Sequence, residues 1–252
     1  MRAFVVAVSL LLSAGLGIAQ SLKIYTEVSS PWQGQGPKGE ATGPVVDVVR
    51  EIQKRVKNAD LIQVVPWARG YAAIQSQPNV VLFLMVRTAE RNELFQWVGP
   101  IVEGSYGLYV KADSTIALPD LEAAKKLGKV GVYLGDARDQ LLTKAGFTNL
   151  ERVTQNQMLV PMLMAGRIDA LAGSDMGIAS LLERSGHSVK DVKLALTFFR
   201  YQAWIAFSKG TPTATVKAWA DALEAMRKSK TLDAIMKVAP TWAPPGPAIT
   251  TF

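Results

Sequence analysis

The chain has 252 residues, of which 49% are hydrophobic and 19% are charged, with 20 glycines, 13 prolines and no cysteine. This composition is typical of a folded globular protein and excludes collagen-like, disordered and disulfide-stabilised structures. The missing cysteine and the single histidine, His187, also exclude thiolate chemistry and histidine-rich metal sites. The net charge of +7 first suggests nucleic acid as a partner, but the basic residues do not cluster, so a solvated basic surface is the better interpretation.

The first 19 residues have the pattern of a secretory signal peptide. Arg2 is followed by an almost wholly apolar run at residues 4–12, and Gly17 and Ala19 supply the small residues that a signal peptidase reads. A membrane-anchoring helix, the alternative, needs about 20 apolar residues, whereas polar residues begin at Gln20. We therefore expect cleavage after Ala19 and export to the periplasm as a soluble protein, without a lipid anchor because no cysteine follows.

Strands and helices then alternate along the first half of the chain. Strands are predicted at 22–26, 61–65 and 80–86, a glycine-rich turn at 29–43, and helices that begin at Pro44 and at Pro66. The run at 80–86 is apolar throughout, as in a parallel strand buried on both faces. This alternation predicts an α/β domain with a mainly parallel sheet.

A second series of strands and helices follows. Strands are expected at 106–110, 129–133, 168–172 and 202–208, and helices at 136–145, 156–165, 176–184, 213–228 and 231–238. The tail at 240–252 contains four prolines and is expected to be extended.

Two such series in a chain of this length predict two lobes. Residues 108–111 and 205–209 look alike and bracket the second series, so both are candidates for strands that cross between the lobes. The alternative, two ordinary buried strands, is not decided by spacing. The crossing-strand interpretation divides the chain into a signal peptide at 1–19, a first lobe at 20–108 and 203–252, and a second lobe at 109–202.

Several segments together resemble one protein family. They are Val-Arg-Thr-Ala-Glu-Arg at 86–91, Phe-Gln-Trp-Val-Gly-Pro at 95–100, the segments at 130–136 and 165–170, and Ala-Phe-Ser-Lys at 206–209. In this order they resemble the bacterial extracellular solute-binding proteins of family 3, the polar amino-acid class, which serve ABC importers. The resemblance implies an α/β fold of two lobes, the type II-like periplasmic binding fold, with two crossing strands as the hinge.

The resemblance also implies a function. A monomer would capture a small polar, carboxylate-bearing solute between its lobes and deliver it to the membrane permease of an ABC importer. No cofactor, metal, nucleic acid or catalysis is implied. A cleft between two lobes desolvates the solute and lets both lobes contact it, so the solute stabilises the closed form.

The Thr-x-x-Arg segment supplies the first candidate ligand residues. Arg91 matches the family arginine that binds the ligand carboxylate, for which a guanidinium can donate two parallel hydrogen bonds. A surface ion pair with Glu93 or Asp47 is the alternative. Thr88 either contacts the ligand or only caps the short helix there, and Arg87 either adds a second cation to the site or faces outward.

Further candidates come from both lobes. Asp175 matches the family aspartate that meets the ligand ammonium, and it also suits the N-cap of the following helix. Trp32 occupies a loop where the family places aromatic residues over the ligand, and Glu27 aligns with an acidic position that some members use for basic side chains. Trp67, Arg69, Asp136 and Arg138, at the starts of two helices, complete the candidate site; core packing is the alternative for Trp67.

One strand departs from the family pattern. Members usually have small hydroxyl residues before Thr-x-x-Arg, whereas residues 83–86 here are Phe-Leu-Met-Val. This strand therefore offers fewer hydroxyl groups to an α-amino acid.

Two other functions remain open on the same scaffold. A dehydratase would need an acid with a raised pKa in the cleft, and Glu27 is the nearest candidate. A ligand-sensing subunit of a membrane receptor would use the same cleft with a different partner. A serine hydrolase would depend on His187, which lies in a polar segment typical of a surface turn.

Overall fold

One mixed sheet runs through the part of the chain described by the computed structural model, residues 21–237. Its eight strands there are ordered β4-β1-β5-β10-β6-β9-β7-β8. They are β1 (Lys23–Thr26), β4 (Ile62–Val64), β5 (Val80–Val86), β6 (Phe95–Lys111), β7 (Val130–Tyr133), β8 (Leu150–Val153), β9 (Ala170–Ser174) and β10 (Val192–Ser208). β1 is parallel to β4 and β5, and β7 is parallel to β8 and β9, whereas β10 is antiparallel to both β5 and β6.

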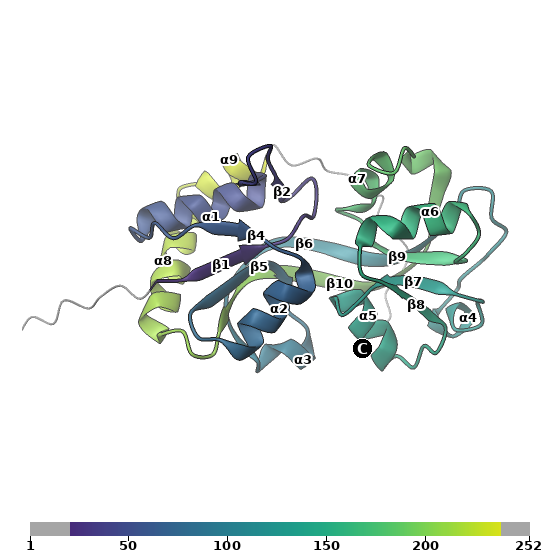
Figure 1. The fold of residues 1–252 in the computed structure, drawn as a ribbon, viewed down its shortest axis with the longest axis horizontal. Helices are drawn as coiled ribbons and strands as arrows, with labels where there is room; N and C mark the ends of the chain where they lie inside the picture. Colours follow the sequence, from purple (N-terminus) through teal and green to yellow (C-terminus); the bar gives the residue numbers. More distant parts are fainter. Residues whose placement is uncertain (1–20, 238–252) are drawn as a thin grey trace, which may run out of the picture.

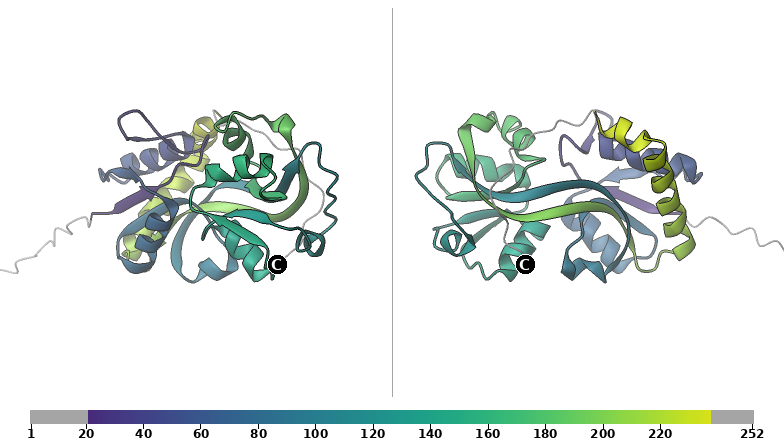
Figure 2. Two further views of the ribbon diagram at one scale, coloured as in Figure 1. Left: turned by 45° about the vertical axis from the view of Figure 1, so that its right-hand side comes forward. Right: turned by 180° about the vertical axis from the view of Figure 1, so that it is seen from behind.

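β6 and β10 join two lobes (Figures 1 and 2). Each is 17 residues long, and they pair with each other from Phe95 opposite Ser208 to Lys111 opposite Val192. β10 pairs with β5 through residues 203–207 in one lobe, whereas β6 pairs with β9 through residues 106–109 in the other. The predicted α/β fold of two lobes is therefore confirmed.

The first lobe contains β1, β4 and β5 with the helices α1 (Pro44–Arg55), α2 (Trp67–Ser76), α3 (Ala89–Asn92), α8 (Thr213–Lys228) and α9 (Thr231–Met236). A short hairpin of β2 (Gly34–Gln35) and β3 (Ala41–Thr42) lies in the predicted glycine-rich turn. The second lobe contains β7, β8 and β9 with α4 (Leu121–Ala124), α5 (Ala137–Lys144), α6 (Leu159–Met164) and α7 (Ile178–Glu183). Single 3₁₀ turns precede α6 at Asn156–Met158 and β10 at Val189–Asp191.

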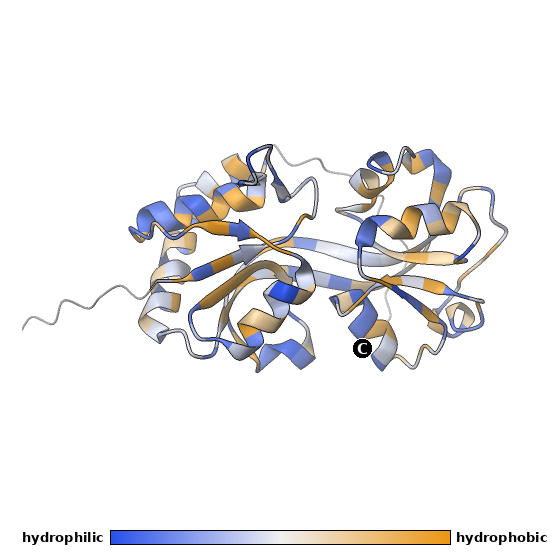
Figure 3. Ribbon diagram, viewed as in Figure 1, coloured by the Kyte–Doolittle hydropathy of each residue, from blue (hydrophilic) through white to orange (hydrophobic). Residues whose placement is uncertain are grey.

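α1 shows how local sequence builds this framework. Pro44 occupies its first turn, where no amide is needed, and Val45, Val48 and Ile52 fall on one fully buried face. The hydropathy colouring shows this alternation of faces (Figure 3). Gly43 has φ 109° and a Cβ there would lie 2.7 Å from the Trp32 carbonyl oxygen, so glycine allows the Trp32 loop to pack onto the helix start.

The same helix ends in a Schellman motif. The Lys57 amide donates to the Lys54 carbonyl oxygen at 3.3 Å, and the Asn58 amide donates to that of Gln53 at 2.8 Å. Lys57 lies between these bonds with φ 55°, a left-handed conformation that favours glycine.

Several predicted elements are found at the expected places, including the strand at 80–86 and the helix at 213–228. The crossing strands are longer than predicted, because polar and glycine-containing stretches such as residues 103–105 interrupt their apolar pattern. The predicted signal peptide at 1–19 and the proline-containing tail at 240–252 lie outside the described residues. Within residues 21–237, no helix has the length and hydrophobicity needed to cross a bilayer.

Candidate functional site

A cavity of about 100 Å³ lies between the two lobes. The first lobe contributes Glu27, Trp32, Trp67 and Arg91 to its wall, and the second contributes Asp136, Arg138, Asn156 and Ser174. A neighbouring cavity of about 300 Å³ shares Glu27, Ser29, Arg138 and Asn156 with it. Six predicted site residues thus meet at one place: Glu27, Trp32, Trp67, Arg91, Asp136 and Arg138.

Arg91 lies on α3, and its side chain is buried with only 1% of the residue exposed. Its Nη1 donates to the Val86 carbonyl oxygen at 3.2 Å, and its Nε donates to Oε1 of Gln140 at 3.1 Å. The guanidinium carbon lies 5.3 Å from the Trp67 ring centroid and 5.0 Å from that of Tyr71. Its Nη2 is buried and has no hydrogen-bond partner among the described residues. The site therefore contains a positioned cationic donor that is available to a ligand.

Asp136 and Arg138 form a buried ion pair at the start of α5. Oδ1 of Asp136 caps the helix by accepting from the amides of Arg138 and Asp139, and its Oδ2 accepts from Nε of Arg138 at 2.6 Å. Arg138 also donates to the Ala172 carbonyl oxygen at 3.0 Å. Burial acts to lower the pKa of Arg138, but Asp136, Tyr106 and Glu27 together outweigh that effect and raise the pKa. The two charges neutralise each other, and both carboxylate oxygens of Asp136 are engaged.

Glu27 follows β1 and faces the second lobe. Burial raises its pKa from 4.5 to about 8, and the nearby negative charge of Asp136 acts in the same direction, while Arg138 and the hydrogen bond from Tyr133 oppose the shift. The Tyr133 hydroxyl donates to Oε2 of Glu27 at 3.4 Å. Glu27 is therefore mostly protonated and uncharged at neutral pH.

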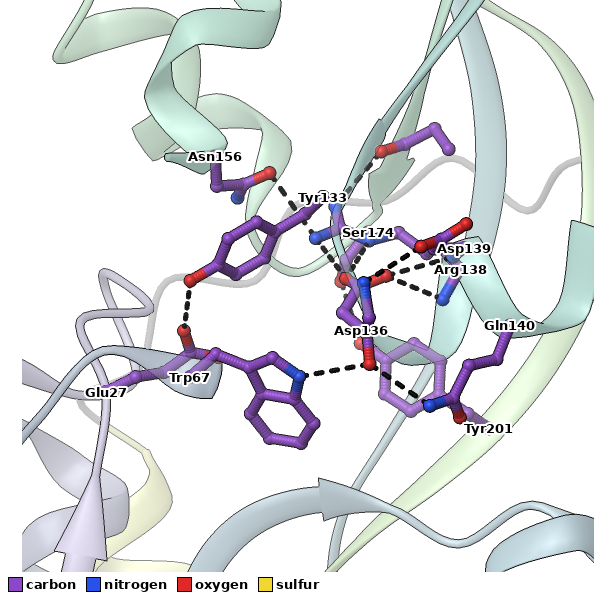
Figure 4. Close-up of polar contacts among 12 residues, drawn as sticks. Glu27, Trp67, Tyr133, Asp136, Arg138, Asp139, Gln140, Asn156, Ser174 and Tyr201 are labelled. Carbon is purple, nitrogen blue, oxygen red and sulfur yellow. Dashed lines mark hydrogen bonds and ion pairs between the residues drawn. The ribbon is translucent and has the colours of Figure 1, made fainter. Parts of the chain in front are cut away.

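Two indole groups connect the lobes across the cavity. Nε1 of Trp32 donates to the Met176 carbonyl oxygen at 2.8 Å, and Nε1 of Trp67 donates to that of Gly135 at 3.1 Å. Figure 4 shows Trp67 pointing from the first lobe towards the start of α5, where Gln140 also binds the Gly135 carbonyl oxygen. These bonds, with those of Arg91 and Glu27, show that the lobes are in contact and that the site is closed.

Four predicted site residues lie outside the walls of this cavity. Oδ2 of Asp175 accepts from the backbone amide and the hydroxyl of Ser105, and its Oδ1 accepts from the Met176 amide at 2.7 Å. Asp175 instead lines a separate cavity of about 190 Å³. Its neighbour Ser174, the last residue of β9, lines the cavity of Arg91. The predicted acid for a ligand ammonium thus has both oxygens engaged by donors and does not line this cavity.

The remaining three have structural contacts or face solvent. Arg87 packs over the rings of Trp97 and Trp204, at 5.6 and 4.9 Å, and donates to Asn92. Thr88 caps α3 by accepting from the Arg91 amide at 3.4 Å. Arg69 is exposed on α2. None of the three lines the cavity.

Sequence analysis missed several residues of the cavity wall. Ser174 shares a hydrogen bond with the Tyr201 hydroxyl at 2.7 Å, and Tyr106 and Gln33 also line the cavity. Tyr106 lies on β6 opposite Ser174 of β9, and Tyr201 lies on β10. Ser174 directly precedes the candidate Asp175. Because successive side chains of a strand point in different directions, Ser174 was the neighbouring alternative at this strand end. Oε1 of Gln33 is buried and, among residues 21–237, without a hydrogen-bond partner.

The model of one protein family matches residues 22–238, nearly the whole of the described chain. It is that of the bacterial extracellular solute-binding proteins, family 3. The chain belongs to this family. No curated protein sequence matches it.

Solved structures of solute-binding proteins and their relatives share the fold. An ancestral arginine-binding protein bound to arginine has a TM-score of 0.75 and 23% identity, covering 87% of this chain and 97% of that one. A histidine kinase sensor domain with similarity to periplasmic binding proteins has a TM-score of 0.79 and 15% identity, covering 89% and 99%. An ancestral amino-acid-binding protein that is a precursor of cyclohexadienyl dehydratase has a TM-score of 0.72 and 19% identity, covering 87% and 94%.

Membership of family 3 of the solute-binding proteins agrees with the chemistry of the cavity. Its described residues offer a guanidinium, aromatic rings, hydroxyls and amides, and residues 21–237 contain no cluster of histidine, aspartate and glutamate able to hold a metal ion. Such a site is equipped to bind a small polar solute by hydrogen bonds and charge.

Proposed function

We propose that the protein is an exported receptor that binds a small carboxylate-bearing solute between its lobes and delivers it to the permease of an ABC importer. The observation that carries this proposal is the buried, unpaired Nη2 of Arg91, a residue of the cavity wall. A guanidinium that is 1% exposed and lacks a carboxylate partner among the described residues is costly to bury. A ligand carboxylate would remove that cost and accept charge-assisted hydrogen bonds.

The balance of charge in the cavity supports an anionic group. Asp136 and Arg138 neutralise each other, and Glu27 is mostly uncharged at neutral pH. Among the described lining residues, this leaves Arg91 as the uncompensated charge. A carboxylate therefore complements the site, whereas a ligand with only cationic groups would meet repulsion.

Contact with both lobes links binding to closure. Arg91 belongs to the first lobe and donates to Gln140 of the second, so a ligand held by Arg91 favours the closed arrangement. A permease that binds only the closed form would then bind mainly receptor that carries a ligand. Family membership supports delivery to an ABC importer. A subunit of a membrane sensor would use the same cavity. Co-purification with a permease or with a sensor kinase distinguishes the two partners.

Titration calorimetry with small carboxylates tests the binding function. The wild-type protein, purified without residues 1–19, is expected to bind a member of the panel, and Arg91→Gln is expected to lose at least tenfold in affinity. Thermal unfolding of unliganded Arg91→Gln should stay cooperative, because the loss of the bonds to Val86 and Gln140 is offset by removal of a buried unpaired charge. Arg69→Gln, which changes an exposed arginine, is the matched control and should bind like wild type. Retained affinity in Arg91→Gln would refute the role of the guanidinium.

Protonated Glu27 favours one second candidate, a dehydratase on the same scaffold. A carboxyl group with a pKa of about 8 can donate a proton to a leaving hydroxyl at neutral pH. The test incubates the protein with a cyclic hydroxy acid and analyses the products. A dehydratase would convert the acid, and Glu27→Gln would lose that conversion. Binding of the same compound without conversion would leave the receptor function alone.

A further inference from the structure

The cavity contains no free acid for a ligand ammonium group. Its two acidic lining residues, within the described part of the chain, are Glu27 and Asp136. Both oxygens of Asp136 are already used by Arg138 and by the first amides of α5. Glu27 is mostly protonated at neutral pH and accepts a hydrogen bond from Tyr133. An ammonium buried here would gain a carboxylate partner only if Glu27 gave up its proton, and Glu27 would then carry a charge in the buried position that disfavours it.

Asp175 does not fill this gap. Three donors, the amide and hydroxyl of Ser105 and the amide of Met176, hold its carboxylate at 2.7–2.9 Å, and it lines a separate cavity. Ser174 takes its place in the cavity wall and presents a neutral hydroxyl already paired with that of Tyr201. The second lobe therefore faces the ligand with neutral polar groups and a neutralised ion pair.

Strand β5 contributes apolar side chains to the cavity wall. Leu84 and Val86 line the cavity, where hydroxyl side chains would otherwise be able to accept hydrogen bonds from an ammonium. Ala203 of β10 adds another apolar group beside them. The wall next to Arg91 is thus suited to the carbon skeleton of a ligand.

Two buried polar atoms of the wall have no partner among residues 21–237: the donor Nη2 of Arg91 and the acceptor Oε1 of Gln33. A buried unpaired donor and acceptor are each unfavourable until a ligand satisfies them. A carboxylate satisfies the first. A neutral O–H or N–H group of the ligand can donate to Oε1 of Gln33. A charged donor would instead bring a charge that a neutral amide oxygen does not compensate.

We propose that the ligand is a carboxylate whose second polar group is a neutral hydrogen-bond donor, as in a hydroxy acid, and that zwitterionic α-amino acids are selected against. This inference rests on the proposed binding function and names the chemical class of its ligand. It assigns Ser174, in the position where an acid would recognise an ammonium, as a residue that determines specificity, with Gln33 as the acceptor of the neutral donor.

Matched ligand pairs test the proposal. Calorimetry at pH 7 would compare each 2-hydroxy acid with the amino acid of the same carbon skeleton: lactate with alanine, malate with aspartate, 2-hydroxyglutarate with glutamate, and phenyllactate with phenylalanine. In a pair that binds, the hydroxy acid is expected to bind at least tenfold more tightly. Equal or tighter binding of the amino acid would overturn this inference and leave the receptor function standing. Absence of binding by every carboxylate would overturn both.

A substitution in the cavity wall gives a second, independent readout. Ser174→Asp places a carboxylate where an ammonium needs it and is expected to reduce or reverse the preference within the pair. Ser174→Asn, of similar size and uncharged, is the matched control and should keep the preference for the hydroxy acid. An unchanged preference in a folded Ser174→Asp protein would contradict the role assigned to Ser174.

Discussion

Arg91 of the first lobe donates through Nε to Oε1 of Gln140 in the second lobe, at 3.1 Å, while its Nη2 is buried without a hydrogen-bond partner among the described residues. One guanidinium thus joins the lobes and contributes to the wall of the cavity between them. Gln140 is fixed in turn because its amide donates to the Gly135 carbonyl oxygen, which also accepts from Trp67. Closure and ligand binding therefore depend on the same small group of side chains.

Gln140→Ala is expected to weaken ligand binding about tenfold, since a hydrogen bond to a charged donor contributes about 1.5–3 kcal/mol. The unliganded protein should become more open because one bond between the lobes is lost. Calorimetry measures the first effect, and the radius of gyration from X-ray scattering measures the second. Gln75→Ala, an exposed change on α2, is the control. Unaltered affinity and radius would show that this bond does not contribute to closure.

Glu27→Gln is expected to change how stability depends on pH. The folded pKa of Glu27, about 8, lies above its ordinary value of 4.5, so the folded state binds an additional proton between these values. The contribution of this group is most favourable below about pH 4.5, declines as pH rises towards 8, and is constant above that. A tenfold change in proton affinity corresponds to about 1.4 kcal/mol, so the total is on the order of a few kcal/mol.

Urea denaturation at several pH values measures this effect. The variant should gain stability relative to wild type from pH 5 to pH 8.5, because glutamine does not ionise beside Asp136, Arg138 and Tyr133. Glu122→Gln, a surface change with the wild-type side chain 74% exposed, should show no such gain. A difference that stays constant over this range would contradict the raised pKa.

Asp136→Asn is expected to destabilise the fold by about 3–5 kcal/mol, because Arg138 keeps its charge in a buried position without its partner. Denaturant midpoints measure the loss. The double variant with Arg138→Met should recover part of it, since the unpaired charge is then removed. Asp221→Asn, which breaks an exposed pair with Lys217, should cost about 0.5 kcal/mol or less. Equal effects at the two pairs would refute the importance of burial.

Lys57→Gly is expected to stabilise the protein by about 0.5–1 kcal/mol, because glycine adopts the left-handed conformation of this position without a Cβ penalty. Lys57 is exposed, so few side-chain contacts are lost. Lys54→Gly, inside the last turn of α1, should instead destabilise by a similar amount. The melting temperatures of the two variants should therefore move in opposite directions; a decrease in both would refute the interpretation.

The sequence predicted those parts of the fold in which one physical signal dominates. The apolar run of β5 and the helical spacing of Val45, Val48 and Ile52 define their elements locally. Only part of each crossing strand was predicted. Each strand runs from one lobe to the other and includes segments such as Glu103-Gly104-Ser105, which have no apolar pattern. The spacing of apolar residues indicates which side chains are buried in one hydrophobic core. It gives no signal where a strand leaves that core.

Side-chain direction limited prediction of the site. Arg91 lies in the cavity, but its bond to Gln140 joins residues 49 positions apart and has no signal in sequence spacing. Asp175 and Ser174 differ by one residue and both accept from the Met176 amide, yet only Ser174 lines the cavity of Arg91, and the sequence does not show which of the two does so. Arg87 was a candidate only as a second cation beside the Thr-x-x-Arg segment, and two tryptophan rings hold it outside the cavity wall.

The adjacent pairing of β6 and β10 has a mechanical consequence. A pair of hydrogen-bonded strands resists elongation but twists and bends with little loss of bonding, so motion of the lobes is confined to rotations that this ribbon permits. The ladder shifts register between Thr197 and Phe199 and between Ala203 and Ile205, and such irregularities are where a strand bends most readily. Rotation of the lobes is therefore expected to concentrate in the torsion of these two neighbouring strands.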